Sequence, residues 1–458
     1  MTAQTILPAN TLSGGYNVAN SCRFDRASSD DFTKTSSGGS KRKATFSAWL
    51  KWGIHVGTST EQGIFESHDG TNYFSVYTDG KNLRANNTGG TGDAIYSTQV
   101  LRDPSAWYHV VIAVDSEQST ASNRFRMYIN GSEVTSFSAA VYPTEDEDMK
   151  FNGSGTIQVG GGAAGNWDGY MAEVVWIDGL QLTPTSFGEF DEDSGIWKPI
   201  DVSDLTFGAN GFYLDFKDSA NLGNDANGGT DLGENNIVAN NQSTDTCTNN
   251  FCTLNPLYNV DGSYTLSVGN TQFLGTGGND HTLGTLGVQG SGKWYFEAEF
   301  DTNSSVCYAG FADVELANNE GTGNPITSFI GMYRDDHTMQ IGGGNEGAYT
   351  DVSDGDIFGF AMNLDAASGS KTVIVQKNGS TIDTVTIPTA NEDNIFIPIA
   401  GDTSGTDSIL KMNFGGTPNP TPSSAVSDAN GFGAFEYSPT IGGVAYLALC
   451  TKNLGSNG

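Results

Sequence analysis

The segment Arg124-Phe-Arg-Met-Tyr-Ile-Asn-Gly131 carries the strongest fold signal in the chain. Phe, Met and Ile take every second position in it, and an Asn-Gly pair follows directly. Strict alternation over a short stretch is typical of a strand with one buried face, and Asn-Gly favours a two-residue hairpin turn. The segment therefore predicts an antiparallel strand that ends at Ile129 and turns back at Asn130 and Gly131.

Similar strand signals extend outward from this hairpin in both directions. Trp107-Tyr-His-Val-Val-Ile-Ala-Val114 is a longer apolar run and predicts a strand buried between two sheets. Further strands are predicted in both halves of the chain, at 44–52, 73–77, 169–179, 211–216, 292–300, 356–365, 371–379 and 409–414. Apolar residues do not form a stripe of useful length at the 3.6-residue spacing of a helix. The pattern predicts an all-β protein.

The composition supports this prediction and limits the classes of partner that the protein can have. Gly accounts for 60 of the 458 residues, which suits the many tight turns of β-sandwiches. The 53 acidic and 21 basic side chains give a net charge of −32, which disfavours nucleic acid and anionic membranes as partners. No apolar run approaches the ~20 residues that span a bilayer, and no signal-peptide pattern opens the chain. The five cysteines are irregularly spaced, so we expect neither a disulfide framework nor a zinc site.

Changes in composition along the chain predict its domain boundaries. A stretch at 221–250 is rich in Asn, Gly, Asp, Thr and Ser, which is typical of an irregular linker or a long surface loop. We therefore expect two β-sandwiches joined by an irregular linker. The expected parts are an N-terminal arm at 1–16, a first sandwich at 17–200, a linker with one strand at 201–260, a second sandwich at 261–416 and a C-terminal tail at 417–458.

The C-terminal tail contains an apolar segment, Tyr446-Leu-Ala-Leu-Cys-Thr-Lys-Asn-Leu454. Its leucines, Leu447, Leu449 and Leu454, need a core to pack against. We predict that the segment packs on another domain or on another subunit. The alternative is a strand that completes the second sandwich.

Motifs in both halves of the chain resemble known families. Trp107-Tyr-His-Val-Val111, Arg126-Met-Tyr-Ile-Asn-Gly131 and Gly169-Tyr-Met-Ala-Glu-Val174 follow one another as in laminin-G/pentraxin-like jelly rolls of the concanavalin A type. Gly292-Lys-Trp-Tyr-Phe-Glu297 and Val375-Gln-Lys-Asn-Gly379 resemble motifs of SPRY domains, which are bent β-sandwiches too. The resemblance implies a concanavalin A-like sandwich followed by a SPRY-like one.

The order of these modules and their linking segments resembles proteins that tailed phages of aquatic bacteria encode. The linking segments are Gly211-Phe-Tyr-Leu-Asp-Phe216 and Cys252-Thr-Leu-Asn-Pro-Leu257. The resemblance implies a non-enzymatic structural or decorative virion protein, assembled in the host cytoplasm and held by protein–protein contacts as a tail fibre, appendage or capsid decoration. Its implied partners are other virion proteins and copies of itself, with a trimer as the usual assembly. The alternative is a receptor-binding adhesin for host-surface glycan, and a polysaccharide depolymerase fits least.

Loops at the rim of the first sandwich supply the candidate binding residues. Laminin-G and pentraxin modules often bind Ca²⁺ through loop oxygens, so the resemblance points to Asp69, Asn72 and Asp168 as calcium ligands. Plain solvated turns are the alternative, and no other cofactor is indicated. Trp167 with Asn166 is the candidate platform for a glycan, with a Trp at the edge of the core as the alternative.

Residues with catalytic potential are sparse. Carboxylates alternate at 189–193 and 297–301, as in glucanases of the concanavalin type, but we expect both sets on solvated surface. The stretch 160–165 matches a dinucleotide fingerprint by letter, yet no helical pattern follows it, so a plain Gly-rich loop is expected. His109 lies on a buried strand and is expected to be a hydrogen-bonded structural residue. The sequence therefore predicts a protein without enzymatic activity.

Overall fold

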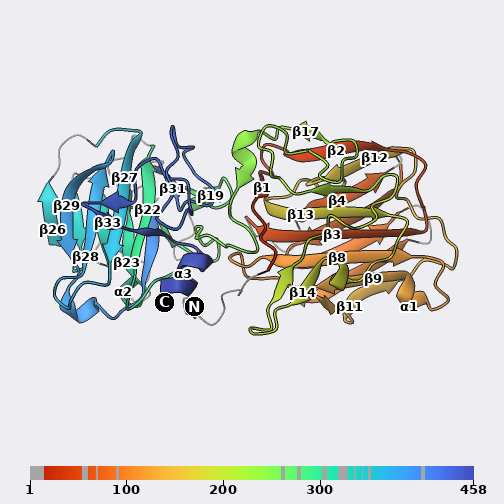
Figure 1. Ribbon diagram of the computed structural model, residues 1–458, viewed down its shortest axis with the longest axis horizontal. Coiled ribbons are helices and arrows are strands. Elements are labelled where there is room, and N and C mark those ends of the chain that lie inside the picture. The colour runs from red at the N-terminus through yellow and green to blue at the C-terminus, as the bar shows by residue number, and fades with distance from the viewer. Residues whose placement is uncertain are drawn as a thin grey trace. The chain divides into compact units, whose positions relative to one another are not determined.

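The structure is a computed structural model. It describes residues 15–53, 60–68, 71–88, 92–258, 264–275, 280–301, 307–317, 328–334, 337–342, 344–348, 352–403 and 408–457. Strands account for 47% and helices for 6% of the residues. The chain forms two compact units, Leu12–Thr248 and Asn249–Gly458, which we call the N-terminal and the C-terminal unit. Each contains two large sheets (Figure 1), so the predicted all-β fold with two sandwiches is confirmed.

The N-terminal unit contains two sheets, which we call sheet I and sheet II. In spatial order, sheet I consists of β10 (Ser132–Glu133), β9 (Phe125–Ile129), β8 (Tyr108–Asp115), β3 (Lys43–Trp52), β13 (Gly169–Asp178), β1 (Ser21–Phe24) and β18 (Gln242–Ser243), with β16 (Phe212–Leu214) beside β13. Sheet II consists of β11 (Phe137–Val141), β7 (Asp93–Val100), β6 (Asn82–Asn87), β5 (Tyr73–Asp79), β4 (Glu61–His68), β12 (Gly155–Val159), β2 (Asp31–Ser36) and β17 (Gly233–Asn235). The short elements of this unit are the hairpin β14 (Gly188–Phe190) and β15 (Trp197–Pro199), α1 (Ala121–Arg124), η2 (Pro184–Ser186) and η3 (Ala239–Asn241).

Alternating apolar residues form the core between sheets I and II. On β5, Phe74 and Val76 are fully buried in this core, so the residues between them face the other side of sheet II. Large aromatic rings fill the centre, where the ring centroids of Phe65 and Trp176 lie 4.6 Å apart. Removing such side chains from water is the main favourable contribution to folding.

The hairpin predicted from the sequence is present. β9 ends at Ile129, which pairs with Ser132 at the start of β10. Asn130 and Gly131 have φ angles of 47° and 77°, and a two-residue hairpin turn of this kind requires positive φ at both positions. Gly131 also lacks room for a side chain, because a Cβ would lie 2.3 Å from the ring of Trp197.

The segment predicted as a linker belongs largely to the N-terminal unit. β16 pairs with β13, β17 with β2 and β18 with β1, so residues 201–248 extend both sheets. Its Asn and Asp side chains bond within the unit: Asn241 Nδ2 donates to Asp30 Oδ2 (2.9 Å), and Asp225 Oδ1 accepts from the N–H of Tyr213 (3.0 Å). The polar composition of this segment suggested a loop. Its polar side chains instead form hydrogen bonds within the folded unit.

The C-terminal unit also contains two sheets, which we call sheet III and sheet IV. In spatial order, sheet III consists of β19 (Tyr264–Ser267), β20 (Gln272–Gly275), β31 (Ser408–Asn413), β22 (Lys293–Phe300), β27 (Asp356–Asn363), β28 (Thr372–Lys377) and β29 (Ser380–Thr386), with β34 (Leu447–Ala448) beside β22. Sheet IV consists of β21 (His281–Leu283), β30 (Phe396–Asp402), β23 (Cys307–Asp313), β24 (Phe329–Tyr333), β25 (His337–Gln340) and β26 (Gly344–Ala348). The short elements are the hairpin β32 (Thr440–Ile441) and β33 (Val444–Ala445), α2 (Val314–Ala317), η5 (Thr389–Asn391) and α3 (Thr451–Asn457).

The C-terminal tail completes its own sandwich. β34 pairs in parallel with Trp294 and Tyr295 of β22, just before the residues of β22 that pair with β31. Leu449 and Leu454 lie in the core of the C-terminal unit. Of the two alternatives for the tail, the structure shows the strand that completes the second sandwich. The first half of β22 supplies backbone groups for β34 to pair with, and the core beside it takes up the leucines. Among the described helices, none has the length and apolar content to cross a membrane.

Candidate binding face

The outer face of sheet I is apolar and covered. Val111 and Val175 on this face pack with Phe187 from the segment that follows sheet I in the chain. Trp49 on the same face clusters with Trp197 of β15. β8 is therefore buried on both sides, as predicted, but connecting segments and not a second sheet cover its outer side.

The outer face of sheet II is polar by contrast. We call its central part the open face and define it by the outward residues of β5, β6 and β7, which are Tyr73, Ser75, Tyr77, Arg84, Asn86 and Tyr96. Tyr77 lies opposite Arg84, and Arg84 lies opposite Tyr96, so these three side chains form a row across three strands. Tyr73, Arg84, Asn86 and Tyr96 are partly exposed.

The row has a defined geometry. The Arg84 guanidinium lies 4.6 Å from the centroid of the Tyr96 ring, which is a cation–π contact, and it also forms an ion pair with Asp79. The rings of Tyr77 and Tyr96 meet edge to face with their centroids 6.4 Å apart. Burial, followed by the neighbouring Tyr96, raises the pKa of Tyr77, so its phenol stays protonated. Because Tyr77 is only 5% exposed, the row presents mainly the Tyr96 ring and the Arg84 guanidinium side by side.

A second row of polar side chains runs beside the first. Glu66 lies opposite Ser75, and Ser75 lies opposite Asn86. The Ser75 hydroxyl lies 2.5 Å from Asn86 Oδ1, and Glu66 Oε2 accepts from the N–H of Ala163 (2.8 Å). Burial raises the pKa of Glu66.

The Gly-rich loop 160–165 borders this second row. The N–H of Gly63 on β4 donates to the carbonyl of Gly165 (3.1 Å). Gly162 has a φ of 142°, and a Cβ there would lie 2.7 Å from Glu66 Oε2, so only glycine allows this approach. The described chain continues from the loop into β13 and not into a helix, in agreement with the predicted plain loop.

Among its direct strand neighbours, Glu66 lacks the second acid of a retaining glycosidase. A retaining glycosidase needs two carboxyl groups about 5–5.5 Å apart. The residues directly beside Glu66 on the neighbouring strands are Gln158 and Ser75, and neither carries a carboxyl group.

The predicted glycan platform lies in the core. Trp167 is 0% exposed and packs edge to face on Trp52, with ring centroids 5.3 Å apart. Asn166 is half-buried, and its Nδ2 reaches the carbonyl of Asp30 (3.5 Å). Trp167 therefore offers no ring to a ligand, and the interpretation of a platform is wrong for this residue. The polar neighbours on both sides suggested exposure, but its own ring fills the end of the sandwich.

Two of the three predicted calcium ligands, Asp168 and Asn72, lie far apart. The N–H of Asp168 donates to Gln62 Oε1 (2.8 Å) near the start of β4, whereas Asn72 precedes Tyr73, which pairs with His68 at the end of β4. Six residues of strand separate these ends by about 20 Å, so Asp168 and Asn72 cannot share an ion. Asp69 lies outside the described residues. Within the described ranges, no three His, Cys, Asp or Glu side chains converge to hold a metal ion.

The two alternating carboxylate stretches differ from each other. At 189–193, Lys198 Nζ lies 3.0 Å from Asp191 and 3.5 Å from Glu189, and the Ser194 N–H together with Lys198 holds the pKa of Asp191 below its usual range. The prediction of solvated surface is wrong for Asp191, which is 3% exposed, and in the second stretch for Glu297, which is 1% exposed.

His109 has a structural role, as predicted. Trp197 Nε1 donates to His109 Nδ1 (3.0 Å), so the ring proton is on Nε2, which faces Ser47 Oγ at 2.8 Å. A general base would need an unprotonated Nε2 toward this hydroxyl. Burial lowers the pKa of His109 to about 3, so the ring stays neutral.

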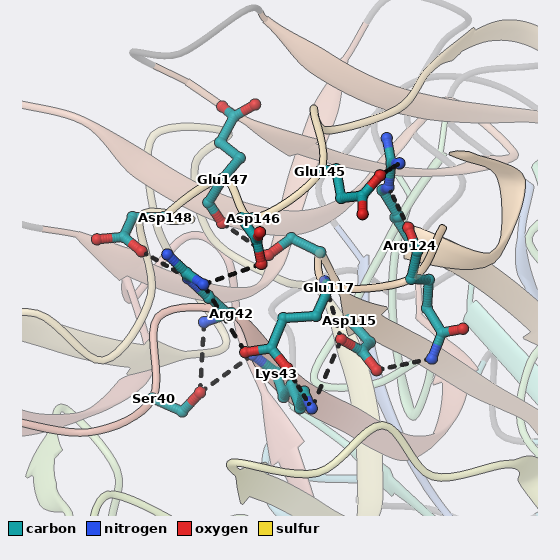
Figure 2. A network of polar contacts seen from close by, with 12 residues as sticks. Ser40, Arg42, Lys43, Asp115, Glu117, Arg124, Glu145, Asp146, Glu147 and Asp148 are labelled. Atoms are coloured by element: carbon teal, nitrogen blue, oxygen red, sulfur yellow. Dashed lines mark hydrogen bonds and ion pairs between the residues drawn. The ribbon is translucent and has the colours of Figure 1, made fainter. Parts of the chain in front are cut away.

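An acid-rich loop at 145–148 is held by basic residues at the start of β3 (Figure 2). Arg42 pairs with Asp146 (3.0 Å) and Asp148 (3.2 Å), and Lys43 pairs with Glu117 (2.7 Å). These side chains are 33% to 62% exposed, so water screens each pair and its contribution to stability is small. The network positions the loop, and its acids are at least partly neutralised.

Comparison with known proteins agrees with the fold of the N-terminal unit. Residues 27–185 match the laminin-G model of the concanavalin A-like lectin/glucanases superfamily. The N-terminal unit is therefore similar to the laminin-G-type, concanavalin A-like domains over residues 27–185. The comparison with curated proteins gave no significant match.

Solved structures with similar folds include three of different origin. A heptameric SAP-like pentraxin from Limulus polyphemus is 16% identical, with a TM-score of 0.28, over 37% of this chain and 80% of the pentraxin. Domains LG4-5 of the mouse laminin alpha1 chain are 10% identical, with a TM-score of 0.30, over 88% of this chain and 91% of theirs. The SPRY domain of human HERC1 is 12% identical, with a TM-score of 0.26, over 35% of this chain and 96% of its own. These similarities concern the fold alone.

Sequence patterns did not predict the row that Tyr77, Arg84 and Tyr96 form. Its signal is present, because Tyr77 and Tyr73 occupy the positions of β5 that alternate with the buried Phe74. Only the pairing of β5, β6 and β7 brings the three side chains of the row together, and alternation within one strand does not reveal register.

Proposed function

We propose that the protein is a non-enzymatic, lectin-like adhesin that binds glycan on the open face of sheet II. The observation that carries this proposal is the cross-strand row of Tyr77, Arg84 and Tyr96 on the outer face of sheet II, in which Arg84 and Tyr96 are partly exposed. Sugars present C–H groups that stack on aromatic rings and hydroxyl groups that bond to guanidinium and amide groups. The partly exposed amide of Asn86 in the second row extends the same surface.

The residues of the face support binding without catalysis. Glu66 has Gln158 and Ser75 as its direct neighbours. On sheet I, away from this face, the tautomer of His109 does not activate Ser47. A polysaccharide depolymerase would release reducing ends from the bound glycan, and we expect no such release.

The proposed location is the virion of a tailed phage, assembled in the host cytoplasm. This part rests on the resemblance of the module order to phage proteins. In that setting the protein would be a decoration, fibre or appendage that contacts other virion proteins and copies of itself. Immunogold labelling of whole particles tests it, and particles without label would contradict it.

A glycan array with four proteins tests the binding proposal. We expect the wild-type protein to bind at least one class of bacterial surface glycan. Tyr96→Ala and Arg84→Ala should each raise the Kd about tenfold or more, because each removes a contact at the centre of the row. Phe190→Ala is the matched control, because Phe190 is an exposed aromatic (52%) on the β14–β15 hairpin, away from the open face. Equal binding by all four proteins, or no binding by the wild type, would refute the proposal.

A further inference from the structure

A buried ion pair joins β3 to the end of the N-terminal unit. Lys51 Nζ lies 2.6 Å from Asp245 Oδ2, and each side chain is only 1% exposed. Lys51 belongs to β3, whereas Asp245 follows β18, so the two residues are 194 positions apart in the chain. The pair is independent of the open face and takes no part in the proposed binding.

The surroundings of the pair are mostly aromatic. The ring centroid of Tyr170 lies 5.8 Å from Lys51 Nζ, and Trp107 Nε1 donates to Asp245 Oδ1 (3.2 Å). Trp107 and Tyr170 belong to the apolar cluster on the outer face of sheet I that also contains Trp49.

The carboxyl group is held in place from several sides. The N–H of Asp245 donates to Ser243 Oγ (3.0 Å), and its carbonyl accepts from Ser21 Oγ (2.7 Å). Its two carboxylate oxygens then face different groups, with Oδ2 toward Lys51 and Oδ1 toward Trp107. An amine, a carboxyl group and a donor for an oxyanion are thus preassembled.

Taking two full charges out of water is costly, and their attraction only partly compensates for it. A neutral product of the same two side chains avoids that cost. With Nζ only 2.6 Å from Oδ2, the two groups that would condense are already in contact.

We propose that Lys51 and Asp245 condense to an isopeptide bond. A proton passes from Nζ to Oδ2, which leaves a neutral amine and a carboxylic acid. The lone pair of Nζ attacks the carboxyl carbon, and Oδ1 takes up the negative charge toward the N–H of Trp107. A second proton moves from Nζ to Oδ2, the bond from carbon to Oδ2 breaks, and water leaves while the carbonyl re-forms. The products are one amide and one water molecule, and no co-reactant is needed.

The bond would tie the 244–248 segment covalently to β3. This segment and its neighbours cover the outer face of sheet I, so the link would keep that cover in place when the rest of the unit opens. A covalent link between distant positions also restricts the unfolded chain.

Mass spectrometry of the intact, denatured wild-type protein tests the proposal without depending on any variant. We expect a mass lower than the calculated one by one water molecule. Trypsin should fail to cleave after Lys51 and should yield a branched peptide that joins 44–81 to 218–293. Trypsin should still cleave after Lys43, whose ion pair with Glu117 is exposed and therefore stays hydrated.

Two variants assign the lost water to this pair. Lys51→Arg keeps the positive charge but removes the nucleophilic amine, and Asp245→Ala removes the carboxyl group. Both should have their full calculated mass and should lack the branched peptide. A wild-type protein of full mass with separate peptides would overturn the proposal, and so would a deficit that persists in either variant.

Discussion

Glu297 Oε1 accepts a hydrogen bond of 2.8 Å from the backbone N–H of Tyr437. The N–H of Glu436 donates to Oε2 (2.9 Å), and Asn413 Nδ2 and the Tyr295 hydroxyl add two donors at 3.0 Å each. Glu297 lies on β22, in the middle of sheet III, and the two N–H groups belong to the C-terminal tail. One buried carboxylate therefore fixes the chain that covers the outer face of sheet III.

We expect Glu297→Gln to destabilise the C-terminal unit. A glutamine has one acceptor oxygen where the carboxylate has two, so at least one buried donor loses its partner. The expected loss in the free energy of unfolding is about 2 kcal/mol, measured by urea denaturation. Glu299→Gln is the control on the same strand, because Glu299 pairs with the partly exposed Lys411 (2.7 Å) and should cost less than about 1 kcal/mol. Equal losses in the two variants would contradict the anchoring role.

Glu173 should make the stability of the N-terminal unit depend on pH. Burial raises its pKa to about 7, against the effect of a hydrogen bond of 2.6 Å from the Tyr213 hydroxyl. The other groups facing it are Tyr16, Lys217 and Asp215. Because the folded state holds a proton that the unfolded state releases near pH 4.5, this contribution is complete below that pH and is lost as the pH rises through 7.

The measurement compares wild type and Glu173→Gln from pH 5 to pH 8. Relative to the variant, the wild-type protein should lose about 2.5 kcal/mol of unfolding free energy over this range. Glu133→Gln is the control, since Glu133 pairs with Arg126 at the surface and should leave the pH profile of the wild type unchanged. Parallel profiles for wild type and Glu173→Gln would show that Glu173 does not titrate in this range.

Local sequence signals predicted the features that depend on few neighbouring residues. Asn130 and Gly131 determine their own turn, because a positive φ angle costs both residue types little free energy. Phe296 and Phe300 alternate with the acids of β22, a pattern that predicts the core face for them, and both are fully buried. Alternation along one strand is sufficient for such predictions.

Features that depend on residues far apart in the chain could not be predicted from the sequence. Glu297 alternates with core residues and resembles a solvated acid until the chain returns 140 residues later to cover it. The burial of Trp167 depends on Trp52, and the row around Arg84 depends on the register of three strands. Period-two patterns show which residues share a face, but not what covers that face.

Calcium binding stays a prediction. The structure places two of its candidate ligands, Asp168 and Asn72, near opposite ends of β4. If Asp168 holds Ca²⁺, millimolar Ca²⁺ should raise the melting temperature of the chelator-stripped protein, because a ligand that binds only the folded state stabilises it. Asp168→Ala should abolish the shift and Asn72→Ala should retain it, since the two residues lie at opposite ends of β4. The reverse result would assign the ion to the end near Asn72. No shift in the wild-type protein would make both residues ordinary turn residues.

Deletion of residues 440–458 should unfold the C-terminal unit. The deletion removes β34 from beside β22 and takes Leu449 and Leu454 out of the core. Each buried leucine contributes about 2–5 kcal/mol, and a whole domain is typically stable by only about 5–15 kcal/mol. Limited proteolysis should therefore digest the C-terminal unit and leave a protected fragment that ends near Thr248. Deletion of residues 456–458 is the control, because it leaves Leu454 in place, and it should give the wild-type pattern. If the tail served only to join subunits, the longer deletion would lower the mass in light scattering while both units stayed protected, and that result would contradict its place in the sandwich.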